Sequence, residues 1–470
     1  MPSWVERWTF EGKEHMKNPI RAVVFKPVKI DQDFVDYHLS PSKSHLIRVL
    51  GLTLLTGKEV LISGVHGAGL DALAMRRCCI QMGMKIIDLD EDMNHLTNGT
   101  RFVPHPNTCY WKATSSGIEK PISVLNAENS GTALRLLIGI SSSLNYPIML
   151  DGDNSLRSRH STELLAALSQ GSVRISHGRG SENLPLIIEG PANFDEISTL
   201  ESSKSSQFIS SLIFASKDIE KQVEIKLVGD QVSRKHSQLT MELSNLFGAG
   251  VELSENSLIL KPWKQANITE YQVPSDLSML SFALLFSRVS QCKVRIGNIP
   301  DIVNGLGNEI LLKHLSSLGF EQDGEFFSSN ENSKTLDLDL TDSNDLITPL
   351  SAILALGEGG RIHGSAHAAH KESNRLEKTK ELLNMFGLEC SLTGDGVEVP
   401  GNQIIKTPQG IVRTHHDHRL AMTAMILAIA KGATIETPNL CKVSDLLFRE
   451  RLSEVWDSAM SPEVLIDVVE

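Results

Sequence analysis

The sequence predicts an α/β fold built from six copies of one two-helix unit, and two repeating signals support this prediction. The first signal is a cluster of small polar residues followed at once by an apolar run at helical spacing, which is typical of a capped helix start. Such clusters begin at residues 42, 129, 205, 275, 344 and 416. The second signal is a glycine that ends a later apolar helical stretch, at residues 83, 171, 248, 319 and 387. Each glycine lies 41 to 44 residues after the start of its unit, and this regularity indicates a repeat.

The six helix starts are the first element of each unit. They read, in chain order, Ser42-Lys43-Ser44, Asn129-Ser130-Gly131-Thr132, Ser205-Ser206-Gln207, Ser275-Asp276, Asn344-Asp345 and His416-Asp417-His418-Arg419. Their side-chain oxygens are expected to accept hydrogen bonds from the free amides of the first helical turn. The five glycines predict left-handed caps at the end of the second helix, and the sixth unit has no such glycine. A run of unrelated, well-capped helices is the alternative.

Strands and domain boundaries follow from the segments between these helices. Short β-branched or alternating segments at 59–62, 222–228, 293–296 and 336–340 predict strands. Extended segments at 37–40 and 271–274 precede the first and fourth units and are expected to cross between two halves of three units each. We therefore expect a discontinuous first domain of residues 21–41 plus 274–470, a second domain of residues 42–273, and an N-terminal arm of residues 1–20.

Composition narrows the class of protein. The 470 residues carry a formal net charge of −12, which argues against a nucleic-acid or anionic-membrane binder. The N-terminus has no apolar core typical of a signal peptide, and no apolar stretch reaches membrane-spanning length. The six cysteines show no CxxC pair and no disulfide-like framework. We expect a cytoplasmic monomer that binds small molecules.

The helix starts also predict an anion site. Free amides and the positive end of the helix dipole favour phosphate or carboxylate, and basic side chains accompany these starts. They are Lys43, Arg48, Arg135 and Arg419 at the starts, and Arg159, Lys371 and Arg375 between them. Arginine suits bidentate recognition of carboxylate or phosphate, whereas lysine can also transfer a proton. Convergence of several starts would form a pocket for a multiply anionic ligand.

At these residues the chain resembles a known family. The Ser-Lys-Ser start with a following arginine, Asn-Ser-Gly-Thr-Ala-Leu-Arg, Ser-Ser-Gln-Phe, an isolated aspartate, Lys-Glu-Ser-x-Arg and Asp-His-Arg occur in order from about Val24 onward. Together they resemble the enolpyruvyl transferases, and most closely the 5-enolpyruvylshikimate-3-phosphate synthases. The resemblance implies a two-domain inside-out α/β barrel of six βαβαββ-like units, with the active site in the inter-domain cleft. It also implies transfer of the enolpyruvyl group of phosphoenolpyruvate to the 5-hydroxyl of shikimate 3-phosphate, releasing phosphate, without a metal or other cofactor.

The resemblance assigns roles by position. Contacts to shikimate 3-phosphate fall on Lys43, Ser44, Arg48, Ser205, Ser206, Gln207, Ser233, Asp345 and Lys371. Contacts to phosphoenolpyruvate fall on Lys43, Gly131, Thr132, Arg159, Gln207, Arg375, His418 and Arg419. The reaction needs a base for the attacking hydroxyl, a reversible acid at C3 and cations for phosphate charge. Asp345 is the expected base, and Glu372 with Lys43 the expected acid/base pair. Closure of the two domains would order this site and exclude water.

Several positions depart from the family pattern and leave alternatives open. They are Ile47, His160, His236, His367, Asn374 and Val443. One alternative is the same chemistry on another alcohol, such as a UDP-sugar, although the 152–159 loop lacks the cysteine typical of that group. The other is a non-catalytic or RNA-cyclase-like relative of the same fold. Asp345 could be only a helix cap, and the 371–375 segment only a solvated helix face. The histidines at 363, 367, 370, 415, 416 and 418 lack the companion ligands of a metal site, and the 64–69 glycines predict a turn.

Overall fold

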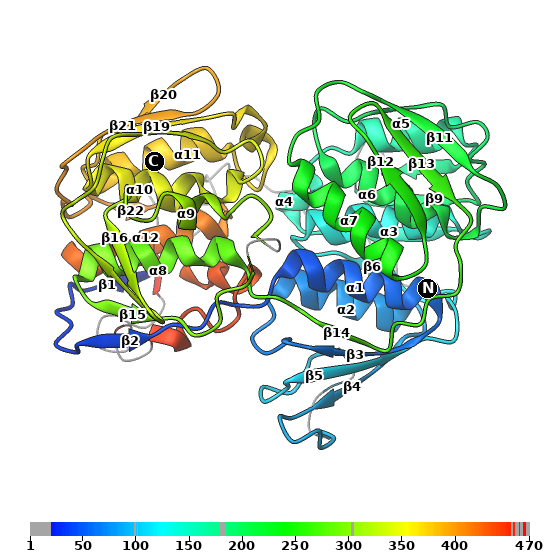
Figure 1. Ribbon diagram of the computed structural model, residues 1–470, viewed down its shortest axis with the longest axis horizontal. Coiled ribbons are helices and arrows are strands. Elements are labelled where there is room, and N and C mark those ends of the chain that lie inside the picture. Colours follow the sequence, from blue (N-terminus) through cyan, green and yellow to red (C-terminus); the bar gives the residue numbers. More distant parts are fainter. Residues whose placement is uncertain are drawn as a thin grey trace, which may run out of the picture.

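Buried apolar side chains gather in two separate cores, one for each of the two lobes in Figure 1. The computed structural model describes residues 20–97, 100, 102–178, 184–301, 305–452, 455, 460 and 464–466. One core takes residues between Val23 and Leu39 and between Leu277 and Val455, and we call this part the first lobe. The other core takes residues between Leu46 and Val273, and we call this part the second lobe. Apart from Ile20, the expected N-terminal arm lies outside the described residues.

The second lobe contains three successive units of helices and strands. Its elements are α1 (Lys43–Thr56), β3 (Glu59–Ser63), α2 (Leu70–Gln81), β4 (Lys85–Leu89), β5 (Tyr110–Thr114), β6 (Leu125–Asn126), α3 (Gly131–Ser142), β7 (Ile148–Asp151), α4 (Asn154–Arg157), α5 (Thr162–Gln170), β8 (Arg174–His177), β9 (Leu186–Glu189), β10 (Thr199–Glu201), α6 (Ser206–Ala215), η1 (Ser216–Asp218), β11 (Val223–Val228), α7 (Arg234–Leu246), β12 (Gly250–Leu253), β13 (Ser257–Lys261) and β14 (Glu270–Gln272).

The first lobe combines two N-terminal strands with the C-terminal half of the chain. Its elements are β1 (Ile20–Phe25), β2 (Phe34–Asp36), η2 (Leu277–Met279), α8 (Leu280–Ser290), β15 (Lys293–Arg295), α9 (Ile310–Lys313), β16 (Phe320–Asp323), β17 (Phe326–Ser329), β18 (Leu336–Asp339), η4 (Asn344–Leu346), α10 (Ile347–Leu356), β19 (Gly359–His363), η5 (Ala366–His370), α11 (Arg375–Met385), β20 (Ser391–Leu392), β21 (Val397–Pro400), β22 (Ile411–Val412), α12 (His418–Lys431), β23 (Ala433–Glu436), η6 (Pro438–Val443), η7 (Glu450–Leu452) and β24 (Val464–Ile466).

The described strands form six four-stranded sheets that share one pattern, and this pattern agrees with the predicted repeat. In every sheet one outer pair is parallel and the two remaining pairings are antiparallel. The orders are β14-β3-β5-β4, β6-β7-β9-β8 and β10-β11-β13-β12 in the second lobe, and β2-β15-β17-β16, β18-β19-β21-β20 and β22-β23-β1-β24 in the first. The predicted strands at 59–62, 222–228, 293–296 and 336–340 are β3, β11, β15 and β18 within a residue or two.

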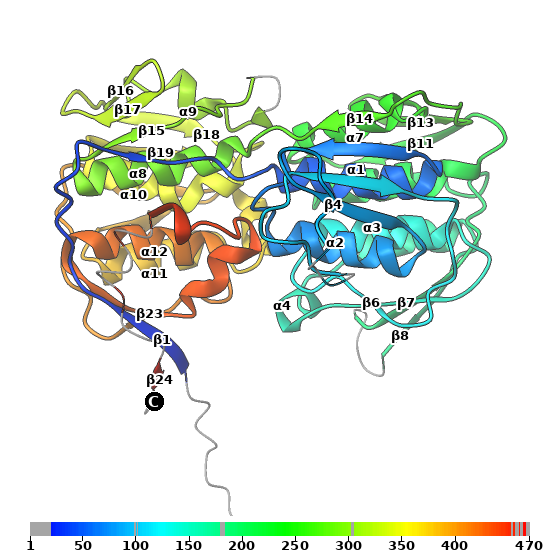
Figure 2. The same ribbon diagram turned by 90° about the horizontal axis from the view of Figure 1, so that it is seen from below.

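Two units exchange their first strands where the chain crosses between the lobes. β2 precedes α1 in sequence but pairs with β15 of the first lobe, whereas β14 precedes η2 but pairs with β3 of the second lobe. The crossing segments run side by side, since Pro41 bridges Ser275 and the Ser42 amide donates to the Pro274 carbonyl at 2.9 Å. Figure 2 shows the blue crossing segment that enters the second lobe at α1. These paired segments join the lobes.

The sixth unit is closed by the start of the chain. β1 occupies the third place in its sheet, between β23 and β24. The described residues between β23 and β24 include the 3₁₀ turns η6 and η7.

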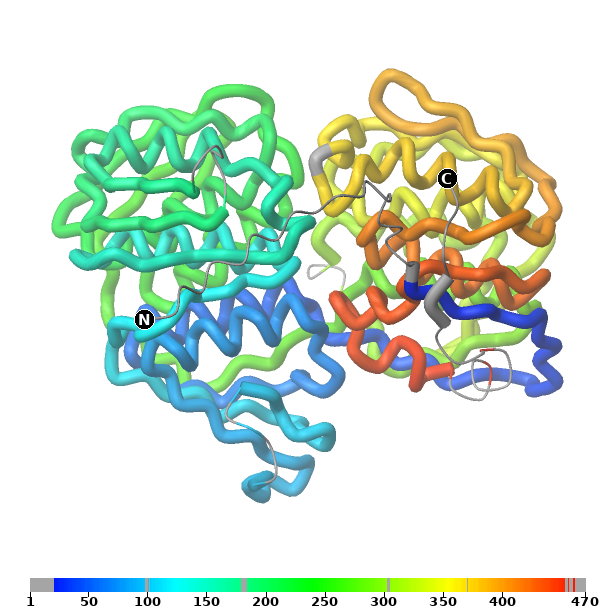
Figure 3. The backbone as a smooth tube through the Cα atoms, turned by 180° about the vertical axis from the view of Figure 1, so that it is seen from behind, coloured from blue at the N-terminus to red at the C-terminus, as the bar shows by residue number. Residues whose placement is uncertain are grey.

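The first helices of the units lie inside each lobe and the sheets lie outside. α1, α3 and α6 contact one another in the second lobe, as α8, α10 and α12 do in the first, and most of their residues are buried. Helices that are apolar on all sides are expected to be buried in this way. Figure 3 shows the two lobes from behind. None of the described helices combines the length and the apolar character needed to cross a membrane.

The predicted caps are confirmed at four of the six helix starts and at four of the five glycines. Ser130, Ser205, Asp276 and Asp417 each accept a first-turn amide with their side chains. The prediction is wrong at the first and fifth starts, because Ser42 and Ser343, which precede those helices, make no side-chain cap hydrogen bond. Gly83, Gly248, Gly319 and Gly387 have positive φ, as a left-handed cap requires. Gly171 does not, because its φ is −78° and Ser172 takes the left-handed conformation instead. A Cβ at Gly171 would lie 2.8 Å from Ile197, so close packing accounts for this glycine.

Candidate active site

Helix starts from both lobes converge on a cavity of about 590 Å³. Twelve predicted site residues line it: Lys43, Ser44, Gly131, Thr132, Arg159, Ser205, Ser206, Gln207, Ser233, Asp345, Lys371 and Glu372. They belong to the first turns of α1, α3, α6 and η4, to the turn before α7, and to the loops before α5 and α11. The structure therefore brings together residues that lie up to 329 positions apart in the sequence.

Four predicted site residues lie behind the cavity wall. Arg48, Arg375, His418 and Arg419 are almost completely buried and do not line the cavity. The Arg48 guanidinium donates to the Thr240 hydroxyl at 2.7 Å and to the backbone carbonyls of Ser44 and His236. It therefore supports the wall formed by α1 and α7.

Asp345 is held between two buried arginines of the first lobe. Its Oδ1 lies 2.7 Å from Arg375 Nη1, and its Oδ2 lies 3.1 Å from Arg419 Nη2. Burial raises the pKa of Asp345, but Arg419, Arg375 and two lysines outweigh burial and hold this pKa well below its usual range. Ser343 is the residue that precedes η4, so Asp345 is not its cap, and the helix-cap alternative is wrong. In this arrangement Asp345 is a stabilised anion.

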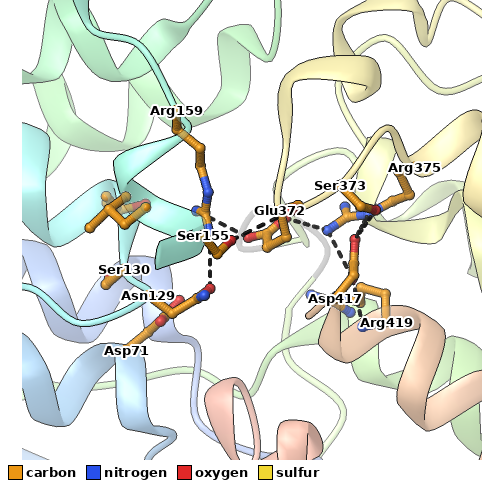
Figure 4. Close-up of polar contacts among 12 residues, drawn as sticks. Asp71, Asn129, Ser130, Ser155, Arg159, Glu372, Ser373, Arg375, Asp417 and Arg419 are labelled. Carbon is orange, nitrogen blue, oxygen red and sulfur yellow. Dashed lines mark hydrogen bonds and ion pairs between the residues drawn. The ribbon is translucent and has the colours of Figure 1, made fainter. Parts of the chain in front are cut away.

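Glu372 joins the two lobes through an arginine on either side (Figure 4). Its Oε2 lies 2.6 Å from Arg375 Nη2 of its own lobe, and its Oε1 lies 3.6 Å from Arg159 Nη1 of the second lobe. The Asn129 and Ser155 side chains accept hydrogen bonds from Arg159 at 2.8 and 3.0 Å. Burial raises the pKa of Glu372, but the two arginines outweigh burial and hold it well below its usual range.

Arg375 itself is fully buried, so the solvated-face alternative for the 371–375 segment is wrong. α11 begins at Arg375, and Lys371 lies before this helix, at the end of η5. Burial lowers the pKa of Lys371, although Asp345 and Glu372 oppose this shift. A lysine with a lowered pKa can give up a proton more readily than an ordinary lysine.

On the second-lobe side, Lys43 is paired with an acid that the sequence analysis did not select. Lys43 Nζ lies 3.0 Å from Asp71 Oδ2, and both side chains are largely buried. Burial lowers the pKa of Lys43, but Asp71, Glu372 and Asp345 outweigh burial and raise it. Gly69 precedes α2, and Asp71 lies in the first turn of this helix. Lys43 is therefore a fixed cation at the cavity wall.

The remaining wall carries hydroxyl and amide groups. Ser205 accepts the Gln207 amide at 3.2 Å, and the Gln207 side chain donates to the Thr132 hydroxyl at 2.9 Å. Ser233 has a left-handed backbone with φ 50°, an uncommon conformation for serine that often marks functional sites. Its hydroxyl accepts Asn344 Nδ2 of the first lobe at 3.2 Å. This side of the cavity is suited to hydroxyl and phosphate groups.

Four further residues complete the site, and the sequence assigns none of them a catalytic role or a substrate contact. They are Asp71, Arg135, Asn344 and Asp417, of which only Asp417 lies outside the cavity lining. Arg135 is predicted only as a basic residue at the second helix start. Asp417 receives Arg375 Nε at 3.0 Å and is completely buried. Its place in the last helix start was a usable signal, whereas no local pattern points to Asp71. In the described residues no group of His, Cys, Asp and Glu is arranged to hold a metal ion.

His418 differs from the lysine and the arginines among the predicted phosphoenolpyruvate contacts, because its surroundings disfavour its charged form. Burial, with Lys43 and Arg419, holds its pKa well below the usual range. Among the described residues neither of its ring nitrogens has a hydrogen-bond partner. Its contact with phosphoenolpyruvate stays a prediction.

Comparison with known proteins identifies one family. Residues 35–452 match the family model described as EPSP synthase (3-phosphoshikimate 1-carboxyvinyltransferase). A 3-phosphoshikimate 1-carboxyvinyltransferase of Methanosphaera stadtmanae is 28% identical over 84% of this chain and 90% of its own length. One of Caldicellulosiruptor saccharolyticus is 30% identical over 68% and 76%, respectively.

Solved structures show the same fold. An EPSP synthase of Acinetobacter baumannii has a TM-score of 0.68 at 21% identity and covers 93% of this chain and 98% of its own. The enolpyruvyl transferase NikO of Streptomyces tendae has a TM-score of 0.68 at 12% identity and covers 95% and 99%.

Proposed function

The chain belongs to the EPSP synthase family, and we propose that the cavity between its lobes is where this chain transfers the enolpyruvyl group. The family's reaction moves the enolpyruvyl group of phosphoenolpyruvate to the 5-hydroxyl of shikimate 3-phosphate and releases phosphate. The observation that carries the placement is the convergence of helix starts and basic side chains from both lobes on one cavity. Both substrates are small polyanions, and such a site suits them.

We propose that phosphoenolpyruvate lies against α3 and the arginines. A Cβ on Gly131 would lie 2.5 Å from Arg135 Nη1 and 3.2 Å from Arg159 Nη1, so the glycine leaves space in front of two cations. Lys43, Thr132 and Gln207 complete this wall. Arg375 and Arg419 reach the ligand only if they turn away from Asp345, which now holds both of them.

That exchange of partners suggests how the base is activated. While Arg375 and Arg419 bind Asp345, its pKa is low and it is a weak base. If the carboxylate of phosphoenolpyruvate draws the arginines toward itself, the pKa of Asp345 rises and it can accept the 5-hydroxyl proton. Glu372 and Lys43 lie on either side of the same space and are the groups proposed to exchange the proton at C3.

The acceptor is proposed to lie on the serine side of the cavity. Ser205, Ser206 and Ser233 supply hydroxyls for the 3-phosphate, and Ser44 and Lys371 face the same space. Closure of residues 21–41 and 274–470 as one domain over residues 42–273 as another would enclose both substrates. The Arg159–Glu372 and Ser233–Asn344 contacts each join one of these two domains to the other.

We also propose that the enzyme acts as a cytoplasmic monomer without nucleic-acid partners. Its acidic charge supports the absence of nucleic-acid partners. Its six unpaired cysteines support a reducing compartment such as the cytoplasm.

The test is phosphate release from phosphoenolpyruvate in the presence of shikimate 3-phosphate. Release should require this acceptor and should not occur with unphosphorylated shikimate at the same concentration, because the three serines would have no phosphate to bind. Release with a UDP-sugar instead would show that the acceptor is assigned wrongly. Absence of release with any alcohol would contradict catalysis by the purified chain.

A further inference from the structure

The two lobes meet at a second place outside the cavity. The turn of residues 64–69, before α2, lies against residues 443–447 of the first lobe. Ala68 forms a backbone bridge with Asp445, and the Leu446 amide donates to the Gly67 carbonyl at 3.3 Å. Figures 2 and 3 show the red segment after α12 reaching the blue helix α2 at the boundary of the lobes. We call this contact the clasp.

The clasp is tightly packed at Gly69. A Cβ there would lie 2.5 Å from the Ser444 carbonyl carbon and 2.6 Å from the Val443 carbonyl oxygen. Gly69 has φ −69° and ψ 165°, which any residue can adopt, so close approach of the other lobe explains this glycine better than its own conformation.

The first-lobe side of the clasp is held by a buried ion pair. Both Asp445 oxygens receive Arg451, at 2.9 and 3.0 Å, and the Asp445 side chain is completely buried. Asp445 Oδ1 also receives the Leu447 amide at 3.0 Å. A buried, bidentate pair of this kind fixes the direction of the chain around it.

The clasp leads directly to a proposed substrate-binding residue. The Gly69 carbonyl accepts the Ala72 and Leu73 amides of α2, and Asp71 lies in the first turn of this helix, 3.0 Å from Lys43 Nζ. Lys43 itself begins α1, immediately after the crossing segments that join the lobes. The backbone of Lys43 is therefore positioned by the crossing segments, whereas its ammonium group is held by α2, which begins at the clasp.

We propose that Asp71 is a positioning residue for Lys43, and that the clasp sets the position of Asp71. In this arrangement the ammonium group reaches its working position only when the lobes are docked at the clasp. The inference rests on the proposed function, since it assumes that Lys43 contacts the substrates.

Substitution of Asp71 tests the first half of the proposal. Asp71→Asn keeps the size of the side chain but removes its charge, and we expect kcat to fall about 10- to 100-fold with a higher KM for phosphoenolpyruvate. Asp71→Glu keeps the charge and should recover part of that loss. A thermal melt of each variant shows whether the fold is retained.

Lysine labelling provides a measurement that does not depend on turnover. Among the described residues, the charged groups that face Lys43 are Asp71, Glu372, Asp345 and Arg419, and the titratable ring of His418 faces it as well; of these only Asp71 is within ion-pair distance. Loss of Asp71 should lower the pKa of Lys43, and each unit of pKa gives about tenfold more free amine below that pKa. Brief acetylation at constant pH, followed by mass spectrometry, should therefore show faster labelling of Lys43 in Asp71→Asn than in the wild type.

Gly69→Ala tests the second half, because its methyl group would separate the clasp without altering the cavity. Gly69→Ala should raise the labelling of Lys43 and lower kcat, as is expected for Asp71→Asn. Gly394→Ala is the matched control, since a Cβ at this exposed glycine meets nothing within 4 Å. Unchanged labelling and kcat in Asp71→Asn would overturn the role of Asp71. Unchanged labelling in Gly69→Ala would overturn the role of the clasp. If the wild type does not turn over, the labelling still decides the inference while the proposed function fails.

Discussion

Replacing Asp345 by asparagine is the sharpest test of the proposed chemistry. The change keeps the size of the side chain but removes the charge that receives Arg375 at 2.7 Å and Arg419 at 3.1 Å. It also removes the group proposed to accept the proton of the 5-hydroxyl. Losing a positioned acid or base typically costs 10²- to 10⁴-fold in rate, or about 2.7 to 5.5 kcal/mol in the activation barrier.

The same substitution should affect binding in the opposite direction. Arg375 would keep Glu372 and Asp417 as partners, but the Arg419 guanidinium would lose the only carboxylate that it contacts among the described residues. A buried arginine without a carboxylate attracts a ligand anion more strongly. We therefore expect Asp345→Asn to bind phosphoenolpyruvate as tightly as the wild type or more tightly, although kcat falls by at least 10²-fold.

The assay separates these two effects. Calorimetry in the presence of shikimate 3-phosphate measures the affinity for phosphoenolpyruvate, and phosphate release measures kcat. Asp339→Asn is a suitable control, since Asp339 lies on β18 outside the cavity lining and its carboxylate accepts hydrogen bonds from the backbone and hydroxyl of Thr341. Wild-type turnover in Asp345→Asn would refute the assignment of the base. A large loss of affinity with little loss of kcat would refute the exchange of arginine partners.

Three further predictions use other parts of the site. Arg159→Ala should raise the KM for phosphoenolpyruvate about 10- to 100-fold, because a charge-assisted bond of about 1.5–3 kcal/mol is lost. Arg157→Ala is the control and should change this KM little, since Arg157 lies outside the cavity lining. Equal effects of the two substitutions would contradict the proposed contact between Arg159 and phosphoenolpyruvate. Ser206→Ala should raise the KM for shikimate 3-phosphate more than that for phosphoenolpyruvate, and the reverse order in initial-rate kinetics would place the 3-phosphate elsewhere. Burial holds the pKa of His45 and His236 at about 3 in the folded chain, below the usual 6.5, so the unfolded chain binds more protons between these values. Stability in urea should therefore fall as the pH decreases below about 6.5, by up to about 1.4 kcal/mol per pH unit for each histidine, and a smaller slope in His45→Asn would identify one source.

The repeat could be read from the sequence because it depends on local signals. Caps such as Ser130 and Asp417, and glycines such as Gly248, act within a few residues of themselves. The exception at Gly171 shows the limit of this reasoning. A Cβ on this glycine would meet Ile197, which lies in the connection between β9 and β10, and only the tertiary structure reveals that contact.

The partners within the site could not be read in the same way. The pairing of Lys43 with Asp71 joins the starts of two different helices, and that of Glu372 with Arg159 joins the two lobes. Asp71 and Glu372 lie in a helix start and a loop, respectively, where an acidic residue is readily explained by its local position alone. The exchange of β2 and β14 between lobes was expected only as a crossing, because strand pairing across 259 residues, as between Asp36 and Arg295, has no local signal.

The acids of the site also explain how the protein keeps a polyanion site folded before a ligand arrives. Buried cations without partners are costly, and removing one partner of a buried pair typically costs about 3–5 kcal/mol. Here Lys43 is paired with Asp71, Arg159 with Glu372, and Arg419 with Asp345. Arg375 is paired with Asp345, Glu372 and Asp417. Among the described residues, Arg135 and Lys371 are the cavity cations that form no ion pair with a carboxylate. In the proposed function, a substrate that brings carboxylate and phosphate groups would supply partners for these two and would replace Asp345 and Glu372 at the arginines. The two acids released in this way would be the same two that are proposed to take part in proton transfer, so binding of the substrate and activation of the base would be one event.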